Sequence, residues 1–75
     1  MKIFLIYGGK SAEHYISIIS AYHILQEIYY EYYQVLPVYI TPEGEWIKGQ
    51  IIDTKAGIPS LAELRKIKGH TFDFN

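Results

Sequence analysis

The residues best suited to chemistry in this chain follow directly after its first apolar run. Residues 3–7 (IFLIY) are apolar, and Gly8, Gly9, Ser11 and Glu13 come next. An apolar run bounded by a glycine pair is typical of a buried strand. In open sheets of parallel strands, ligands bind outside the carboxyl ends of the strands. We therefore expect the polar groups after the glycine pair to lie at a ligand-binding edge.

Two roles are open for Glu13, which we expect in the first turn of a helix whose N-cap is Ser11. Its carboxylate could hold the ammonium group of a ligand in the crevice between strand and helix. It could also complement only the positive end of the helix, a contribution of ~0.3–1 kcal/mol. The residues alone favour this second role, because acids are common in first turns. Gly8 and Gly9 likewise could serve only a turn with positive φ.

The segment at Gly8 and Gly9, here called the glycine loop, fits two phosphate-binding motifs poorly. Gly9, Lys10 and Ser11 match the end of a P-loop, but that motif needs a glycine where Phe4 stands, inside the strand. The dinucleotide fingerprint GxGxxG fails because Gly8 and Gly9 are adjacent. Direct binding of a nucleotide by this loop is therefore not expected.

The composition limits the classes of function. The 75 residues allow one small domain, with a net charge of −1 and no cysteine. Such a chain has no basic field for nucleic acid or anionic lipid and no thiolate metal site. Its histidines lack the spacing of metal ligands (His14, His23 and His70). No apolar stretch approaches the ~18 residues of a membrane span. We expect a cytoplasmic protein that binds neither nucleic acid nor membrane.

The elements that position these groups follow from hydrophobic periodicity. We expect a strand at 2–7, a helix from Ala12 or His14 to Tyr29, and a second strand at 35–40. A strand, a helix and a strand in that order form a right-handed βαβ unit with parallel strands, the first half of a Rossmann-like sheet.

The second half of the chain adds two short elements. We expect a return strand at 45–49 and a helix at 60–67, where Ser60 and Glu63 fit a capping box. Together with the βαβ unit they predict a partial Rossmann-like three-layer α/β fold, in one domain over residues 1–75.

The first strand needs a partner that the chain does not offer. It is apolar at successive positions, which is typical of a strand covered on both faces. The strand at 35–40 can pair with one of its edges, and no segment is evident for the other. Since unpaired edges recruit partners, we expect the edge of 2–7 to pair with a further part of a longer chain, or with a second copy in a homodimer.

Two segments resemble one enzyme family. Residues 8–17 (GGKSAEHYIS) resemble the N-terminal signature of D-alanine–D-alanine ligases, which runs GG-x-SAE-x-E-V-S. Residues 33–49 resemble the same family in the order and spacing of their proline, glycines and tryptophan. The resemblance covers about residues 1–49.

The resemblance implies a ligase that joins two D-alanines for peptidoglycan synthesis, using ATP and magnesium. Both would be bound by central and ATP-grasp domains that we expect to lie outside this chain. The chain alone should therefore be inactive, with no cofactor and no catalytic residue of its own. Glu13 would contact the ammonium group of the first D-alanine, and Ile16 would lie against the same pocket. Gly8, Gly9 and Ser11 would shape the loop around it.

The resemblance also has departures and limits. Tyr15 stands where the family usually has a second acid, which would weaken any network supported by that acid. His70 precedes Thr71 rather than the glycine of the family's His-Gly strand. We expect an N-terminal piece whose partners are D-alanine and the rest of the ligase chain. The second substrate could be D-alanine, D-lactate or D-serine. The alternative function is a stand-alone, non-catalytic α/β module that binds itself or a partner.

Overall fold

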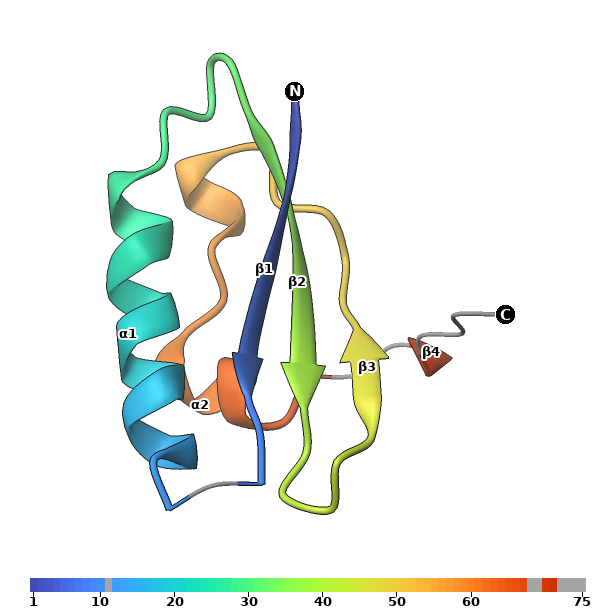
Figure 1. Ribbon diagram of the computed structural model, residues 1–75. Helices are drawn as coiled ribbons and strands as arrows, with labels where there is room; N and C mark the ends of the chain where they lie inside the picture. The colour runs from blue at the N-terminus through green and yellow to red at the C-terminus, as the bar shows by residue number, and fades with distance from the viewer. Residues whose placement is uncertain (11, 68–69, 72–75) are drawn as a thin grey trace.

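Strands and helices alternate along the first half of the chain (Figure 1). The computed structural model describes residues 1–10, 12–67 and 70–71. The expected elements are present close to their expected bounds. In chain order the elements are β1 (Lys2–Gly8), α1 (His14–Glu27), β2 (Gln34–Ile40), β3 (Trp46–Lys48), the 3-10 helix η1 (Lys55–Gly57), α2 (Leu61–Arg65) and β4 (His70–Thr71).

One sheet contains the strands in the order β1-β2-β3-β4. β1 and β2 are parallel along their whole length, from the pair Lys2–Gln34 to the pair Gly8–Ile40. β3 is antiparallel to β2, and β4 is antiparallel to β3. The parallel pair joined by α1 confirms the predicted βαβ unit. Within the described residues β1 is an edge strand, in agreement with the missing partner noted in the sequence.

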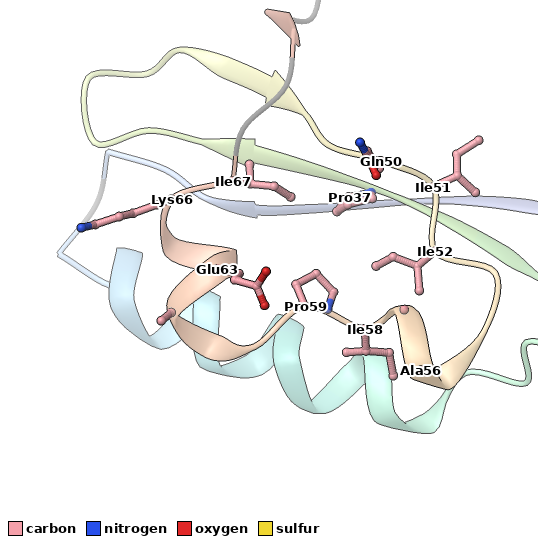
Figure 2. Close-up of a pocket in the computed structure, with 12 residues that line it drawn as sticks. Pro37, Gln50, Ile51, Ile52, Ala56, Ile58, Pro59, Glu63, Lys66 and Ile67 are labelled. Atoms are coloured by element: carbon pink, nitrogen blue, oxygen red, sulfur yellow. The ribbon is translucent and has the colours of Figure 1, made fainter.

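Both helices and η1 lie on the same side of the sheet (Figure 2). The described residues therefore form two layers, and the expected three-layer arrangement is wrong for them. The reason is a single shared core. Leu64 of α2 and Ile52 are buried in the same cluster as the apolar face of α1, so α2 packs beside α1 rather than behind the sheet.

The core lies between α1 and the sheet. Ile18, Ala21 and Leu25 follow the three- and four-residue spacing of one helix face, and all three are buried. The strands and α2 close the core from the other side, with Tyr7, Val35, Tyr39, Ile52 and Leu64.

α1 ends two residues earlier than expected. Its last residue is Glu27, and Ile28 already has an extended backbone. The Tyr30 hydroxyl donates to the carbonyl of Leu25 over 2.7 Å, so it satisfies one of the carbonyls left open at a helix end. Tyr29, which we expected to be the last residue of the helix, lies beyond its end and is 74% exposed.

The face of β1 that points away from α1 carries two large apolar side chains that are about half exposed. Phe4 is 55% exposed and Ile6 is 49% exposed. The expectation that both faces of β1 are covered is therefore wrong for the described residues, because both helices lie on the opposite face. An open edge and an open apolar face thus occur on the same strand.

Candidate functional site

The glycine loop lies at the carboxyl ends of the two parallel strands (Figure 1). The Gly9 N–H donates to the carbonyl of Ile40, the last residue of β2, over 2.8 Å. The Gly8 N–H donates to the Ser17 hydroxyl of α1 over 3.0 Å. These two bonds attach the loop to the second strand and to the helix. The predicted position of the loop is confirmed, and Ser17 faces the loop rather than only the polar side of the helix.

The two glycines are required for different reasons. Both have a positive φ, 94° at Gly8 and 110° at Gly9. A Cβ on Gly8 would overlap the Ile40 carbonyl oxygen, and would lie 3.1 Å from Tyr39 Cε1 and 3.2 Å from His14 Cε1. A Cβ on Gly9 would meet nothing within 4 Å. Gly8 is therefore required by both space and backbone conformation, and Gly9 by conformation alone.

His14 connects the loop to β2. Its Nδ1 is hydrogen-bonded to the Gly9 carbonyl, and its Nε2 is 3.0 Å from the Tyr39 hydroxyl. The two rings meet edge to face, with centroids 5.5 Å apart and planes at 68°. From the sequence, His14 was considered only as a metal ligand, and this role was not predicted. The available signal was a histidine at the start of a helix, five residues after a glycine turn.

Two buried tyrosines extend this contact into the core. The Tyr39 and Tyr7 ring centroids are 5.4 Å apart, and the Tyr7 hydroxyl donates to the Leu64 carbonyl over 2.8 Å. Burial raises the pKa of Tyr7 far above its usual value, and the neighbouring Tyr39 raises it further. Burial also raises the pKa of Tyr39, with Glu43 adding to the rise and Arg65 opposing it. Both side chains are therefore neutral hydroxyls at physiological pH.

Glu13 lies just before α1 instead of in its first turn. It is the N-cap residue, its side chain makes no capping hydrogen bond, and the first turn contains no acid. Its carbonyl accepts the Ser17 N–H over 2.9 Å, and its side chain is exposed at the carboxyl end of the sheet. The predicted N-cap, Ser11, is wrong because the helix begins later, at His14. Ser11 itself lies outside the described residues.

Ile16 is also accessible. It is 62% exposed on the outer side of the first turn of α1. Ile16 follows Glu13 by three residues, the spacing at which side chains of a helix lie on the same side. The predicted carboxylate and apolar group are therefore at one end of the molecule, next to the glycine loop.

A hollow in the described residues lies elsewhere. It is an open pocket of about 780 Å³ between α2 and the segment that follows β3 (Figure 2). Its lining is mostly apolar, and its acid, Glu63, is already hydrogen-bonded to Ser60. The pocket thus offers little polar chemistry. The glycine loop is the better candidate site, since its hydrogen-bonding groups and Glu13 converge at the carboxyl edge of the parallel strands.

Two other kinds of site are absent from the described part of the chain. No group of three or more His, Cys, Asp or Glu side chains there could hold a metal ion. No helix there is long and apolar enough to cross a membrane.

Comparison with known proteins identifies relatives of the chain. The family model described as "D-ala D-ala ligase N-terminus" matches residues 2–70. The chain is 53% identical over 55 residues to a D-alanine–D-alanine ligase of Enterococcus hirae, covering 73% of this chain and 15% of the relative. It is 44% identical over 54 residues to a ligase of that name from Listeria monocytogenes, covering 72% of this chain and 15% of the relative.

A solved structure agrees with these matches. The crystal structure of the VanG D-Ala:D-Ser ligase from Enterococcus faecalis superposes with a TM-score of 0.69 and 26% sequence identity, over 87% of this chain and 17% of that one. The chain thus spans about 15% of the length of the curated relatives it matches. The extent of the family match, over the βαβ unit and the residues after it, means that the chain belongs to the D-alanine–D-alanine ligase N-terminus family.

Proposed function

We propose that this chain is the N-terminal portion of a D-alanine–D-alanine ligase and forms part of its first D-alanine site. The observation that carries the proposal is the position of Glu13. Its exposed carboxylate follows the glycine loop at the carboxyl ends of β1 and β2, where ligands of parallel sheets bind. The printed names of the relatives, which are D-alanine–D-alanine ligases, support the substrate.

In this proposal Glu13 accepts hydrogen bonds from the ammonium group of the first D-alanine. Such a charge-assisted bond is stronger than a neutral one, and it also fixes the direction of the amino acid. Ile16 provides an apolar surface near the methyl group of the substrate. The Gly8–Gly9 turn keeps side chains out of the space beside the carboxylate.

The proposed ligase uses ATP and magnesium, which would be bound by parts of a longer protein outside these residues. ATP and magnesium would activate the carboxylate that forms the peptide bond in peptidoglycan synthesis. This chain contributes binding and orientation only, so the chain alone is expected to lack ligase activity. Release of phosphate that depends on both ATP and D-alanine, by the purified 75-residue chain, would contradict this.

The open edge of β1 extends the proposal to partners. In a longer ligase the rest of the chain would cover this edge and the exposed side chains of Phe4 and Ile6. In the isolated chain we expect a second copy to pair there, because unpaired strand edges recruit other strands. Sedimentation velocity tests this, and a monomer at all concentrations would argue against self-pairing.

The role of Glu13 is tested in a chimera. The matching 55-residue segment of the Enterococcus hirae ligase is replaced by that of this chain, which is 53% identical to it. A charged hydrogen bond contributes roughly 1.5–3 kcal/mol. We therefore expect Glu13→Gln to raise the KM for the first D-alanine roughly 10- to 100-fold.

The matched control is Glu27→Gln, which neutralises an exposed acid at the other end of α1. This variant should have the KM and kcat of the unsubstituted chimera. An unchanged KM in Glu13→Gln would return this carboxylate to a purely electrostatic role at the helix end.

A further inference from the structure

The His14 side chain joins three elements around the proposed site. It begins α1 directly after Glu13, and its ring reaches back to the Gly9 carbonyl and across to the Tyr39 hydroxyl on β2. The ring is partly buried, and neither of its nitrogens faces an acid in these contacts. His14 has no role in the proposed function as stated above.

The two contacts determine where the proton of the neutral ring lies. A carbonyl oxygen can only accept, so Nδ1 must donate to Gly9. Nε2 then carries the lone pair of the neutral imidazole, and the Tyr39 hydroxyl donates to it. Both ring nitrogens are thereby satisfied, and the ring cannot turn over without losing two hydrogen bonds.

The partner on β2 is itself held by the core. Tyr39 is 6% exposed and packs against Tyr7, with ring centroids 5.4 Å apart. Tyr7 is held by its hydrogen bond to the Leu64 carbonyl of α2. A continuous series of contacts therefore runs from the loop carbonyl, through three rings, to the second helix.

We propose that His14 is a positioning residue for the first D-alanine site. By linking the Gly9 carbonyl to the Tyr39 hydroxyl, it sets where α1 begins relative to Gly9 and β2. Glu13 is the residue next to it, so the same two hydrogen bonds set the direction of the carboxylate. The inference rests on the proposed function, because it is the ammonium contact of Glu13 that His14 would align.

The test uses the same chimera and compares the loss of both bonds with the loss of one. His14→Phe keeps an aromatic ring and removes both bonds, whereas Tyr39→Phe removes only the hydroxyl. One neutral hydrogen bond corresponds to roughly a 2- to 10-fold change. We expect the KM for the first D-alanine to rise about 10-fold or more in His14→Phe and about 3-fold in Tyr39→Phe, with kcat nearly unchanged.

Two further variants separate positioning from folding. His14→Asn places an amide donor near the position of Nδ1 and should recover part of the lost affinity. His23→Phe changes an exposed histidine on the same helix and should leave KM unchanged. A His14→Phe variant that loses kcat and thermal stability together, at constant KM, would overturn the positioning role and leave a structural one.

The proton on the ring gives an independent readout. Selective 15N labelling of histidine in the chimera, with His14 assigned by the signal lost in His14→Phe, should show protonation at Nδ1 in the neutral ring. A ring protonated at Nε2 would overturn the proposed contacts. If Glu13→Gln leaves KM unchanged while the Nδ1 proton is found, the proposed function fails and the contacts of His14 stand. If Glu13→Gln raises KM and His14→Phe does not, only the positioning role fails.

Discussion

The two helices begin in different ways, and the difference separates a structural end from a functional one. At the start of α2, the Ser60 hydroxyl accepts the Glu63 N–H over 3.2 Å, and Glu63 Oε1 accepts the Ser60 N–H over 3.0 Å. At the start of α1, the Glu13 side chain makes no capping hydrogen bond. The capping box satisfies the end of α2 with its own residues. The end of α1 keeps its positive dipole directed to the carboxyl edge of the sheet.

This contrast explains why only one helix start belongs to the candidate site. Where an acid of the helix itself forms the capping hydrogen bonds, that acid is less able to bind a ligand. Glu13 is exposed beside the glycine loop and makes no capping hydrogen bond, whereas the Glu63 carboxylate accepts the Ser60 N–H within the capping box. Changes at the start of α1 should therefore alter binding, and changes at the start of α2 should alter stability.

The largest effect on stability is expected from a substitution at Gly8, the last residue of β1. Gly8→Ala places a methyl group against the Ile40 carbonyl and forces a residue with a side chain to a φ of 94°. Strain of this kind costs about 1–3 kcal/mol, and the backbone overlap adds to it. We expect the free energy of unfolding to fall by about 3 kcal/mol or more, measured by urea denaturation.

Gly9→Ala is the matched control for this change. Gly9 has a similarly positive φ of 110°, but a Cβ there has open space. We expect it to cost about 1 kcal/mol, from backbone conformation alone. Equal losses at both glycines would show that the contacts of Gly8 with Tyr39 and Ile40 do not restrict it.

A smaller effect is expected at the start of α2. Ser60→Ala removes the hydroxyl that accepts the Glu63 N–H and should lower the free energy of unfolding by about 1 kcal/mol. In the chimera it should leave the KM for D-alanine unchanged, in contrast to Glu13→Gln. A change in that KM would mean that the two helix starts are coupled, and the contrast drawn above would fail.

The smallest effect is a dependence of α2 on pH. The Ser60 N–H, followed by the Ser60 hydroxyl, holds the pKa of Glu63 below its usual value. The carboxyl has a lower pKa in the folded state than in the unfolded state. It therefore contributes stability above its unfolded pKa, and this is lost as pH falls through the folded pKa. Urea denaturation over acidic pH should show a shallower fall for Glu63→Gln, and identical slopes would contradict the role of the carboxylate.

Local patterns in the sequence predicted most of the fold. Hydrophobic periodicity predicted the helix α1, and Ser60 with Glu63 predicted the start of α2. These signals were correct because the interacting residues lie within one or two helical turns of each other. The open edge of β1 was also predictable, because one parallel partner can pair with only one edge.

The predictions were wrong where contacts with a distant part of the chain determine the structure. The start of α1 depends on how the loop is attached to β2, so Glu13, rather than Ser11, became the N-cap. The side on which α2 packs depends on the shared core around Leu64, so two layers formed in the described residues. Phe4 and Ile6 are about half exposed because both helices lie over the opposite face of β1.

By itself the sequence determined the strand–helix–strand order, the glycine pair at the carboxyl end of the first strand, and the acid that follows it. These features depend on residue type and on spacing over a few positions, and the family match rests on the same residues. Only the tertiary structure decided that His14 contacts both Gly9 and Tyr39. That contact joins residues 25 positions apart in the chain. It requires the parallel register of β1 and β2 and the rotation of α1 about its axis, which core packing sets and local sequence does not.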